Sequence, residues 1–434
     1  MSATRRSWRE RVAGVRIDLT PLRTSRDFRL LFSAGTVFYL GGMVSYVALP
    51  FQLYQLTGSS FAVGLMGLVE LLPLLVFGLY GGALADHVDR RTMLVSTGVA
   101  QVVLTALLLV NATLASPRLW AIYAVGALLS VAQSLQRPSR EALIPRTVRH
   151  DELPAAVSLT SLGSHVGQLA GPTLGGVLVS TTGVASAFAV DVAGLVAATV
   201  LFAAMRPYPP GAASTPPSLA GIVEGIRYAV RRRDLLGTYL IDIVAMFMAM
   251  PVVLFPALAT GVFHRPGLLG LLYTAETVGG LAATATSGWT SRVHHHGRAV
   301  VVAATVYGAS IGLVGLAPGP WSAMALLAVA GAADMVSAVF RGVIWHQTIP
   351  DDKRGRLAGI EMLSYSIGPL GGQARAGLVA GATSVRASIV SGGVLCVIGV
   401  AGTAVWLSDF WRYDARTDVH AVHEREVRAR AGRQ

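Results

Sequence analysis

The sequence contains few charged residues. Asp, Glu, Lys and Arg make up 13% of its 434 residues, whereas hydrophobic residues make up 53%. A soluble domain usually has about a quarter of its residues charged. Apolar stretches long enough to cross a hydrocarbon core of about 30 Å recur along the chain, and no alternating pattern suggests a transmembrane barrel. These features exclude an ordinary soluble globule and predict an all-α membrane protein.

Cysteine and lysine each occur once, as Cys396 inside an apolar stretch and as Lys353. A single cysteine excludes an intramolecular disulfide framework. Arginine carries nearly all of the positive charge, and the formal net charge is +12. In a membrane protein, topology and attraction to anionic lipid explain this excess better than nucleic acid does. We therefore expect a lipid bilayer, and no nucleic acid, as a partner.

The apolar stretches form two sets of six. They lie near residues 28–55, 61–84, 93–114, 119–136, 156–181, 184–205, 236–262, 267–290, 299–317, 320–342, 357–381 and 387–407. Between the sets, a Pro/Gly/Ser-rich stretch precedes an amphipathic pattern from Leu219 to Val230, which predicts a helix on the membrane surface. We expect a basic N-terminal segment, a first half, a linker, a second half and a tail, at 1–27, 28–205, 206–235, 236–407 and 408–434.

Arginine is unevenly distributed among the connections. With a cytoplasmic N-terminus, the outer loops contain three arginines, Arg118, Arg265 and Arg386. Apart from Arg375, which lies within a stretch, the other basic residues lie in the tails or inner connections, or at stretch ends facing them. Because positive residues favour the cytoplasmic side, we expect both termini there.

Short similarities relate the two halves. GLMGLV at 64–69 resembles GLLGLL at 267–272, and GPTLGG at 171–176 has a shifted counterpart in GPLGG at 368–372. Two six-helix halves in the same orientation are the parallel repeat of one transporter class, in which the substrate site lies at their interface.

Two motifs carry a resemblance to a known family. GGALADHVDRR at 81–91 is similar to the G-x-L-x-D-x-x-x-R-R signature of the major facilitator superfamily, and GQLAGPTLGG at 167–176 is similar to its antiporter motif, G-x-x-x-G-P-x-x-G-G. PLRTSRDFRLLF and LLGLLYTAETVGG resemble the enterobactin-exporter subgroup of bacterial efflux proteins. The resemblance covers nearly the whole chain. It implies twelve transmembrane helices in two six-helix halves, in the inner (plasma) membrane of a bacterium.

The resemblance assigns the first motif to a cytoplasmic latch, whose residues are Gly82, Asp86, Arg90 and Arg91. Asp86 would face a neighbouring helix N-terminus, whose partial positive charge favours a carboxylate. Arg90 and Arg91 would pair with acids on nearby inner connections. The alternative is a solvated, positively charged loop, although orientation requires arginines and not Asp86.

Glycine recurs at every fourth position from 163 to 175, which places these residues on one helix face and permits close helix contact. Pro172 removes a backbone donor and can bend the helix. A packing seam explains this pattern by itself. The resemblance adds that the motif seals one end of the transport pathway and allows outward transport. The motif residues are Gly167, Gly171, Pro172, Gly175 and Gly176.

Ionisable side chains within the apolar stretches are costly and usually functional. The candidates for binding protons or substrate are Glu70, Glu276, Asp242, Asp334, Arg341 and Arg375. Glu70 and Glu276 each precede the glycine of a loop motif by twelve residues, so we expect similar depths in matching helices. We expect at least one of them to bind a proton or substrate. The alternative is a buried acid held by a fixed hydrogen-bond donor.

Several other residues have two interpretations. Asp334 and Arg341 share a helix face and can line the central cavity, or Arg341 can mark the cytoplasmic end. Arg375 can attract an anionic substrate or pair with a buried acid. Asp191 is expected to be structural. The histidines at 294–296 are expected to be a solvated segment and not a metal site.

The combined features predict a secondary efflux transporter. It would move an amphipathic small molecule, such as a siderophore or a drug-like compound, outward by alternating access in exchange for protons. The alternatives are a membrane-embedded lipid-modifying enzyme, which would need clustered catalytic groups, and a lipid transporter of the same fold. We expect no catalytic residue, cofactor or metal, and a monomeric protein.

Overall fold

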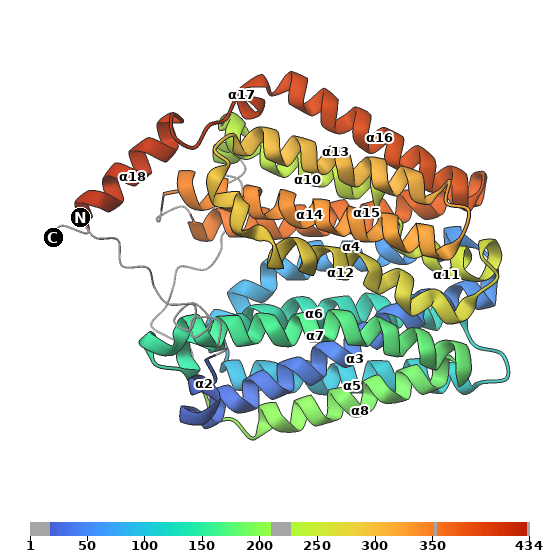
Figure 1. The fold of residues 1–434 in the computed structure, drawn as a ribbon. Helices are drawn as coiled ribbons and strands as arrows, with labels where there is room; N and C mark the ends of the chain where they lie inside the picture. Colours follow the sequence, from blue (N-terminus) through green and yellow to red (C-terminus); the bar gives the residue numbers. More distant parts are fainter. Residues whose placement is uncertain (1–17, 210–226, 351–353, 432–434) are drawn as a thin grey trace, which may run out of the picture.

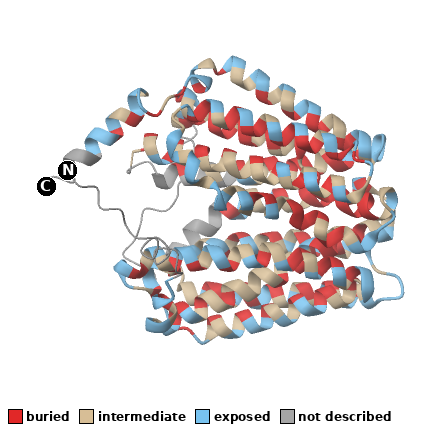
Figure 2. Cartoon of the chain, viewed as in Figure 1, coloured by how far each residue is buried: buried red, intermediate tan, exposed pale blue. Residues whose placement is uncertain are grey.

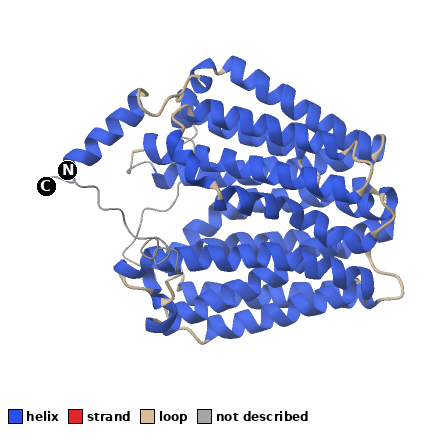
Figure 3. Ribbon diagram, viewed as in Figure 1, coloured by secondary structure: helices blue, strands red, loops and turns tan. Residues whose placement is uncertain are grey.

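The computed structural model describes residues 18–209, 227–350 and 354–431. Within these ranges, the backbone alone is described at residues 79–86, 354–356, 358–360, 362–363 and 428–431. Most of the predicted amphipathic linker helix, 219–230, therefore lies outside the described residues. The described residues contain helices and loops and no strand (Figure 3).

The first half contains six long helices after the short α2 (Thr20–Thr24). These are α3 (Arg26–Thr57), α4 (Ser60–His87), α5 (Arg90–Thr113), α6 (Leu119–Thr147), α7 (Leu153–Thr181) and α8 (Val184–Ala203). A single 3-10 turn, η1 (His150–Glu152), precedes α7. The polar residues between the apolar stretches end the helices: Ser25 and Asp89 accept hydrogen bonds from Phe28 N and Thr92 N as N-caps, and Gly58 ends α3 with a φ of 63°.

The second half has six further long segments, and the first of them is interrupted. They are α10 (Arg233–Ala249), α12 (Leu269–Ala285), α13 (His296–Val314), α14 (Pro320–Thr348), α15 (Arg354–Ala382) and α16 (Val385–Trp406). After α10 come the short turns η2 (Val252–Leu254), α11 (Phe255–Ala257), η3 (Leu258–Val262) and η4 (Pro266–Leu268). Pro251 and Pro256 lack the N–H that a continuous α-helix needs. The predicted stretch 236–262 is therefore not one regular helix.

Among the described residues, ten helical segments are long and apolar enough to cross a membrane. The glycine-rich α7 and α15, of 29 residues each, are not among them. Exposed residues line the outside of the bundle (Figure 2), and they include apolar ones such as Val405 and Val76, which expose 80% and 64% of their area. A soluble protein of this kind would expose a large apolar surface to water. The predicted all-helical membrane class is confirmed, whereas crossing by α7 and α15 stays a prediction.

The helices form two bundles, α3–α8 and α10–α16 (Figure 1). Within the first bundle, α3 packs against α7 and α8. Between the bundles, α4 packs against α15 and α7 packs against α12. The end of the molecule that carries α2 and α18 is called the terminal end below. The opposite end, with the turns at 57–60, 182–183 and 383–384, is called the distal end.

The segment after residue 407 packs against the second bundle. It contains α17 (Ser408–Trp411) and α18 (Val419–Ala431). Phe410 is fully buried and lies against Gly237 of α10 and Gly297 of α13. The sequence predicts a charged tail at 408–434. This charge does not indicate that the tail docks on the bundle, because the contact depends on one aromatic side chain, Phe410.

Candidate functional site

Glycines bring the two halves into contact at the distal end. Gly64 of α4 faces Gly377 of α15, and a Cβ added to Gly64 would lie 2.7 Å from the Gly377 Cα. One turn further along α4, a Cβ at Gly67 would lie 2.6 Å from the Leu370 carbonyl oxygen. These helices therefore touch through their backbones, as small residues allow in membranes.

A second contact relates the other pair of helices in the same way. Gly270 of α12 packs on α7, where it meets the Pro172 carbonyl oxygen, Thr173 and Gly176. Gly67 and Gly270 occupy the same place in the two repeated segments, GLMGLV and GLLGLL. The internal repeat thus supplies both inter-half contacts, a role that the sequence similarity alone did not indicate.

The predicted glycine seam of α7 faces α3 within the first half. Gly163 lies against Thr36, Gly167 against Tyr39, and Gly171 against the Met43 Cβ and the Leu40 carbonyl oxygen. Gly175 lies against Val44. The close-packing prediction is confirmed for these positions. Gly176 lies on the neighbouring face of α7 and contacts Gly270 of the second half. Among these glycines, Gly176 is therefore placed to affect how closely the two halves pack.

The second half contains a counterpart of this seam. Gly368, Gly371 and Gly372 of the GPLGG segment pack on α10, against Met246 and Phe247. A Cβ at Gly368 would lie 2.9 Å from the Met246 Cβ. Thus α15 lies on α10 as α7 lies on α3, and the weak sequence repeat corresponds to equivalent packing.

A buried ion pair joins α10 to α14. Arg341 donates a hydrogen bond to Asp242, and both side chains are at least 96% buried. Ser364 of α15 donates to the other Asp242 oxygen at 2.9 Å. The guanidinium also lies 3.8 Å from Asp334, whose side chain is 41% exposed, and 6.0 Å from the Tyr365 ring centroid. Asp242, Asp334 and Arg341 are therefore one cluster within the second half.

Glu276 extends this cluster towards the first half. Its carboxylate interacts electrostatically with Asp334, and its backbone lies directly against Gly331, one turn before Asp334 on α14. Its Oε1 atom is buried and has no hydrogen-bond partner. Glu276 thus differs from Asp242, whose two oxygens are both engaged.

Glu70 and Glu276 lie on α4 and α12, one in each half. Ser130 donates to the backbone oxygen of Glu70, and a Cβ added to Gly126 of α6 would lie 3.9 Å from the Glu70 Oε1 atom. Between the halves, the ring of Tyr46 on α3 packs edge-on against Tyr273 of α12, with centroids 5.6 Å apart.

Arg375 lies apart from these acids. Its Nη2 is 3.5 Å from the Ser388 carbonyl oxygen, and Nε and Nη1 are buried without a hydrogen-bond partner. Within the described part of the chain, no ion pair involves Arg375. Of its two interpretations, pairing with a buried acid finds no support in this geometry.

The loop motif is described in part. Only the backbone is described at Gly82 and Asp86, so the contact of the Asp86 side chain stays a prediction. Asp89 caps α5, accepting from Thr92 N at 2.9 Å. The Arg91 guanidinium donates through Nε and Nη2 to the Ala203 carbonyl oxygen, and its pairing with an acid stays a prediction. Ala203 ends α8, and the partial negative charge of a helix C-terminus attracts a cation.

Polar networks fasten the terminal end of each half. In the first, Asp27 is 1% exposed and accepts hydrogen bonds from Arg206 at 2.9 Å and Tyr208 at 2.7 Å. Burial and the hydrogen bond to Asp27 raise the pKa of Tyr208 to about 12. The backbone N–H of Arg90 donates to the Tyr208 carbonyl at 3.1 Å. The connection after α8 is thereby tied to the starts of α3 and α5.

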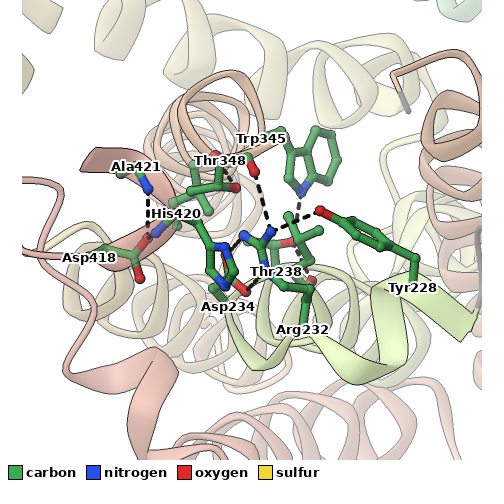
Figure 4. Close-up of polar contacts among 11 residues, drawn as sticks. Tyr228, Arg232, Asp234, Thr238, Trp345, Thr348, Asp418, His420 and Ala421 are labelled. Atoms are coloured by element: carbon green, nitrogen blue, oxygen red, sulfur yellow. Dashed lines mark hydrogen bonds and ion pairs between the residues drawn. The ribbon is translucent and has the colours of Figure 1, made fainter. Parts of the chain in front are cut away.

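Arg232 is the centre of the network in the second half (Figure 4). It forms an ion pair with Asp234 and donates to Tyr228 Oη at 3.0 Å and to the Thr348 carbonyl at 3.4 Å. Burial would lower the pKa of Arg232, but the Asp234 ion pair outweighs it and raises the pKa. Residues Asp418, His420 and Ala421 of the tail lie beside this network in the same view.

The remaining predicted residues have structural surroundings. Asp191 is 3% exposed, pairs with Ser45 of α3 and lies against Gly41. The prediction of a solvated histidine segment is wrong for His296, which is 5% exposed and packs near Phe340 and Tyr413. The described residues contain no group of three or more potential metal ligands.

Comparisons with known proteins agree with this architecture. Residues 17–431 match the family described as transmembrane secretion effector. The enterobactin exporter EntS of Citrobacter koseri is 28% identical over 88% of this chain and 92% of its own length, and EntS of Escherichia coli gives the same values. These relatives are transporters, which agrees with the expectation that the protein is not an enzyme.

Solved structures share the fold at low sequence identity. A POT family transporter in complex with 5-aminolevulinic acid has a TM-score of 0.70 at 10% identity, with 89% of this chain and 97% of that chain covered. A bacterial homolog of the human lysosomal transporter Spinster, inward-facing and unoccupied, has a TM-score of 0.63 at 15% identity, with 89% and 95% covered. Together with the family match, these findings identify the chain as a member of the transmembrane secretion effector family of multi-pass major facilitator transporters.

Proposed function

We propose that this protein is a proton-coupled exporter of an amphipathic small molecule in a bacterial inner membrane, with both termini in the cytoplasm. The observation that carries the proposal is the series of ionisable groups from the interface into the second half, which runs Glu276, Asp334, Arg341 and Asp242. Glu70 is the second candidate acid and belongs to the first half. A series of this kind can couple a proton to the relative position of two bundles.

Glu276 is the proposed proton-binding residue. Burial of a carboxylate oxygen without a hydrogen-bond partner makes the ionised form costly, and binding a proton removes the charge. Protonation of Glu276 would also remove its repulsion with Asp334. The interaction of the Arg341 guanidinium would then be divided less evenly between Asp334 and Asp242. This change would affect α10 through Asp242, and α15 through the hydrogen bond of Ser364 to Asp242. The proton thereby biases the packing of the second half against the first.

The glycine contacts at the distal end support alternating access. Gly64 with Gly377, and Gly176 with Gly270, allow a close seal in which the backbones of facing helices touch. Under the positive-inside orientation this seal faces outward, and substrate enters from the cytoplasm. Tyr46, which exposes 37% of its area, supplies aromatic surface at the interface of the halves, which suits an amphipathic cargo such as a siderophore or a drug-like compound. Relatives of this chain are enterobactin exporters by name.

Proteoliposomes with an imposed pH gradient test the proposal. Wild-type protein should accumulate or expel a labelled siderophore according to the gradient, and Glu276→Gln should lose this response while retaining substrate counterflow. Glu141→Gln is the matched control, because Glu141 is an exposed acid that pairs with Arg137. Full gradient-driven transport by Glu276→Gln, Glu70→Gln and the double variant would contradict the assignment of these acids.

A further inference from the structure

A lateral groove of about 570 Å3 lies between η5 (Ser287–Arg292), α13 and α14. Small side chains such as Ala303 and Ala332 leave the space, and Val302, Val306 and Val329 border it. The valines expose between 41% and 54% of their area, so the groove is open towards the side of the bundle. Its volume lies in the range of ligand sites, about 300–1,000 Å3.

One end of the groove is basic. Arg298 and His295 lie there with Trp289, which is 43% exposed. The Arg298 guanidinium lies 5.8 Å from the Trp411 ring centroid, and no ion pair occupies it in the described ranges. His295 is 3.5 Å from Asp414. A hydrogen bond from Arg416 N–H, together with the charge of His295, lowers the pKa of Asp414, so this carboxylate remains ionised.

The basic and apolar parts lie at different depths. Arg298 lies in the first turn of α13, at the terminal end, whereas Val306 lies two turns further along. At 1.5 Å per residue, about 12 Å of helix separates them. In a membrane crossed by α13, the charged end would be level with the surface and the valines would lie within the hydrocarbon. Tryptophan is enriched at this boundary, and Trp289 lies there.

We propose that this groove binds one anionic phospholipid, with an acyl chain between α13 and α14 and the phosphate against Arg298 and His295. The occupant follows from charge and position: an available guanidinium at the surface and an apolar channel below it match a phosphate attached to a hydrocarbon chain. The inner leaflet, which this end faces under the proposed orientation, is rich in anionic lipid. The groove opens laterally, and neither Glu70 nor Glu276 lines it.

Native mass spectrometry of the purified full-length protein tests the site, with phosphatidylglycerol or phosphatidylcholine titrated into detergent. Phosphatidylglycerol should occupy the first site more tightly. Arg298→Gln should weaken its binding roughly fivefold, because one surface arginine contributes about that factor, and should leave phosphatidylcholine unchanged. Asp414→Asn should strengthen it. Arg149→Gln, at an exposed arginine of the first half, is the control.

A variant of the apolar part distinguishes lipid from other occupants. Ala332→Leu fills the groove and should weaken both lipids, whereas Arg298→Gln affects the anionic lipid alone. Equal affinities for the two lipids in the wild type, or equal effects of Arg298→Gln and Arg149→Gln, would overturn the proposal. A third result would also overturn the proposal: a wild-type protein that is a dimer without bound lipid, and an Ala332→Leu variant that is a monomer with bound lipid. The groove would then be a protein interface.

Discussion

Asp242 and Glu276 are acids of the same half, but Asp242 is buried and Glu276 is half-buried, and their surroundings differ. Asp242 has an ion pair with Arg341 and a hydrogen bond from Ser364, and three helices meet at it. Glu276 lies at the interface of the halves with a buried oxygen that has no partner. The comparison separates two uses of a carboxylate in a membrane: one holds helices in place, and the other can change its protonation without breaking a network.

The difference predicts opposite responses to neutralisation. Removing one partner of a buried pair leaves an uncompensated charge, which costs much more than the pair itself contributes. Removing the charge of an acid without a partner leaves nothing uncompensated. Variants at Asp242 and its partners should therefore lose stability, while variants at Glu276 should lose coupling.

Arg341→Gln should give the largest loss of stability. The substitution leaves the buried Asp242 carboxylate without its cation, at a cost of about 3–5 kcal/mol in the free energy of unfolding. Denaturation in a mild detergent, followed by size-exclusion chromatography, measures the change. Arg137→Gln is the control, because its pair with Glu141 is about 60% exposed on both sides and should contribute less than about 1 kcal/mol.

The double variant Arg341→Gln, Asp242→Asn sharpens this prediction. With both charges removed, most of the lost stability should return. A double variant as unstable as Arg341→Gln alone would mean that packing of the arginine, and not its charge, stabilises the cluster.

Gly270→Leu should have the next largest effect. The leucine side chain would meet the Pro172 carbonyl and the Thr173 backbone, and overpacking of this kind costs about 1–3 kcal/mol. Because the contact joins the halves, transport should fall further than stability. Gly42→Leu on α3 is the control, since nothing lies within 4 Å of a Cβ there. Equal transport by the two variants would show that this contact does not close the distal end.

Ser364→Ala should produce a smaller loss than Arg341→Gln. It removes one hydrogen bond to the ionised Asp242 and keeps the ion pair, and a hydrogen bond to a charged group contributes about 1.5–3 kcal/mol. The same denaturation assay measures it, with Ser391→Ala, whose hydroxyl bonds only its own helix, as the control. A loss equal to that of the control would remove Ser364 from the Asp242 network.

Most of the fold could be predicted from the sequence, because the length of an apolar stretch is a local property of the chain. The helices lie where the stretches predict them, apart from three places. Helix α6 continues to Thr147, beyond the predicted end at 136; the segment after Met250 is irregular; and Ser287–Arg292, at the end of the eighth stretch, form a 3-10 helix. The division into halves and the α7 seam also follow from repeated small residues. The docking of Phe410 could not be predicted, since its cavity is created by Gly237 and Gly297 from two distant helices.

The candidate site was harder to predict from the sequence than the fold was. The ionisable residues could be chosen because charge is rare in the apolar stretches, and Asp242, Asp334 and Arg341 do form one cluster. Which acid has a partner could not be read from spacing, because Ser364 and Arg341 reach Asp242 from separate helices. Arg91 shows the same limit: its acceptor is a backbone carbonyl at the end of α8, which a search for acidic side chains does not find.

Glu276→Gln should have the smallest effect on stability, and it completes the comparison. Glutamine keeps the size of the side chain and removes a charge that has no hydrogen-bond partner at Oε1. The free energy of unfolding should change by less than about 0.5 kcal/mol, as for a substitution that breaks no network. Asp242→Asn, tested beside it, should lose several times more, because Arg341 then remains as a buried cation without its acid. Both variants are compared with wild type in one detergent and at one pH by chemical denaturation. If Glu276→Gln is as unstable as Asp242→Asn, Glu276 also holds the helices in place, and the proton-binding residue must be sought at Glu70 or Asp334.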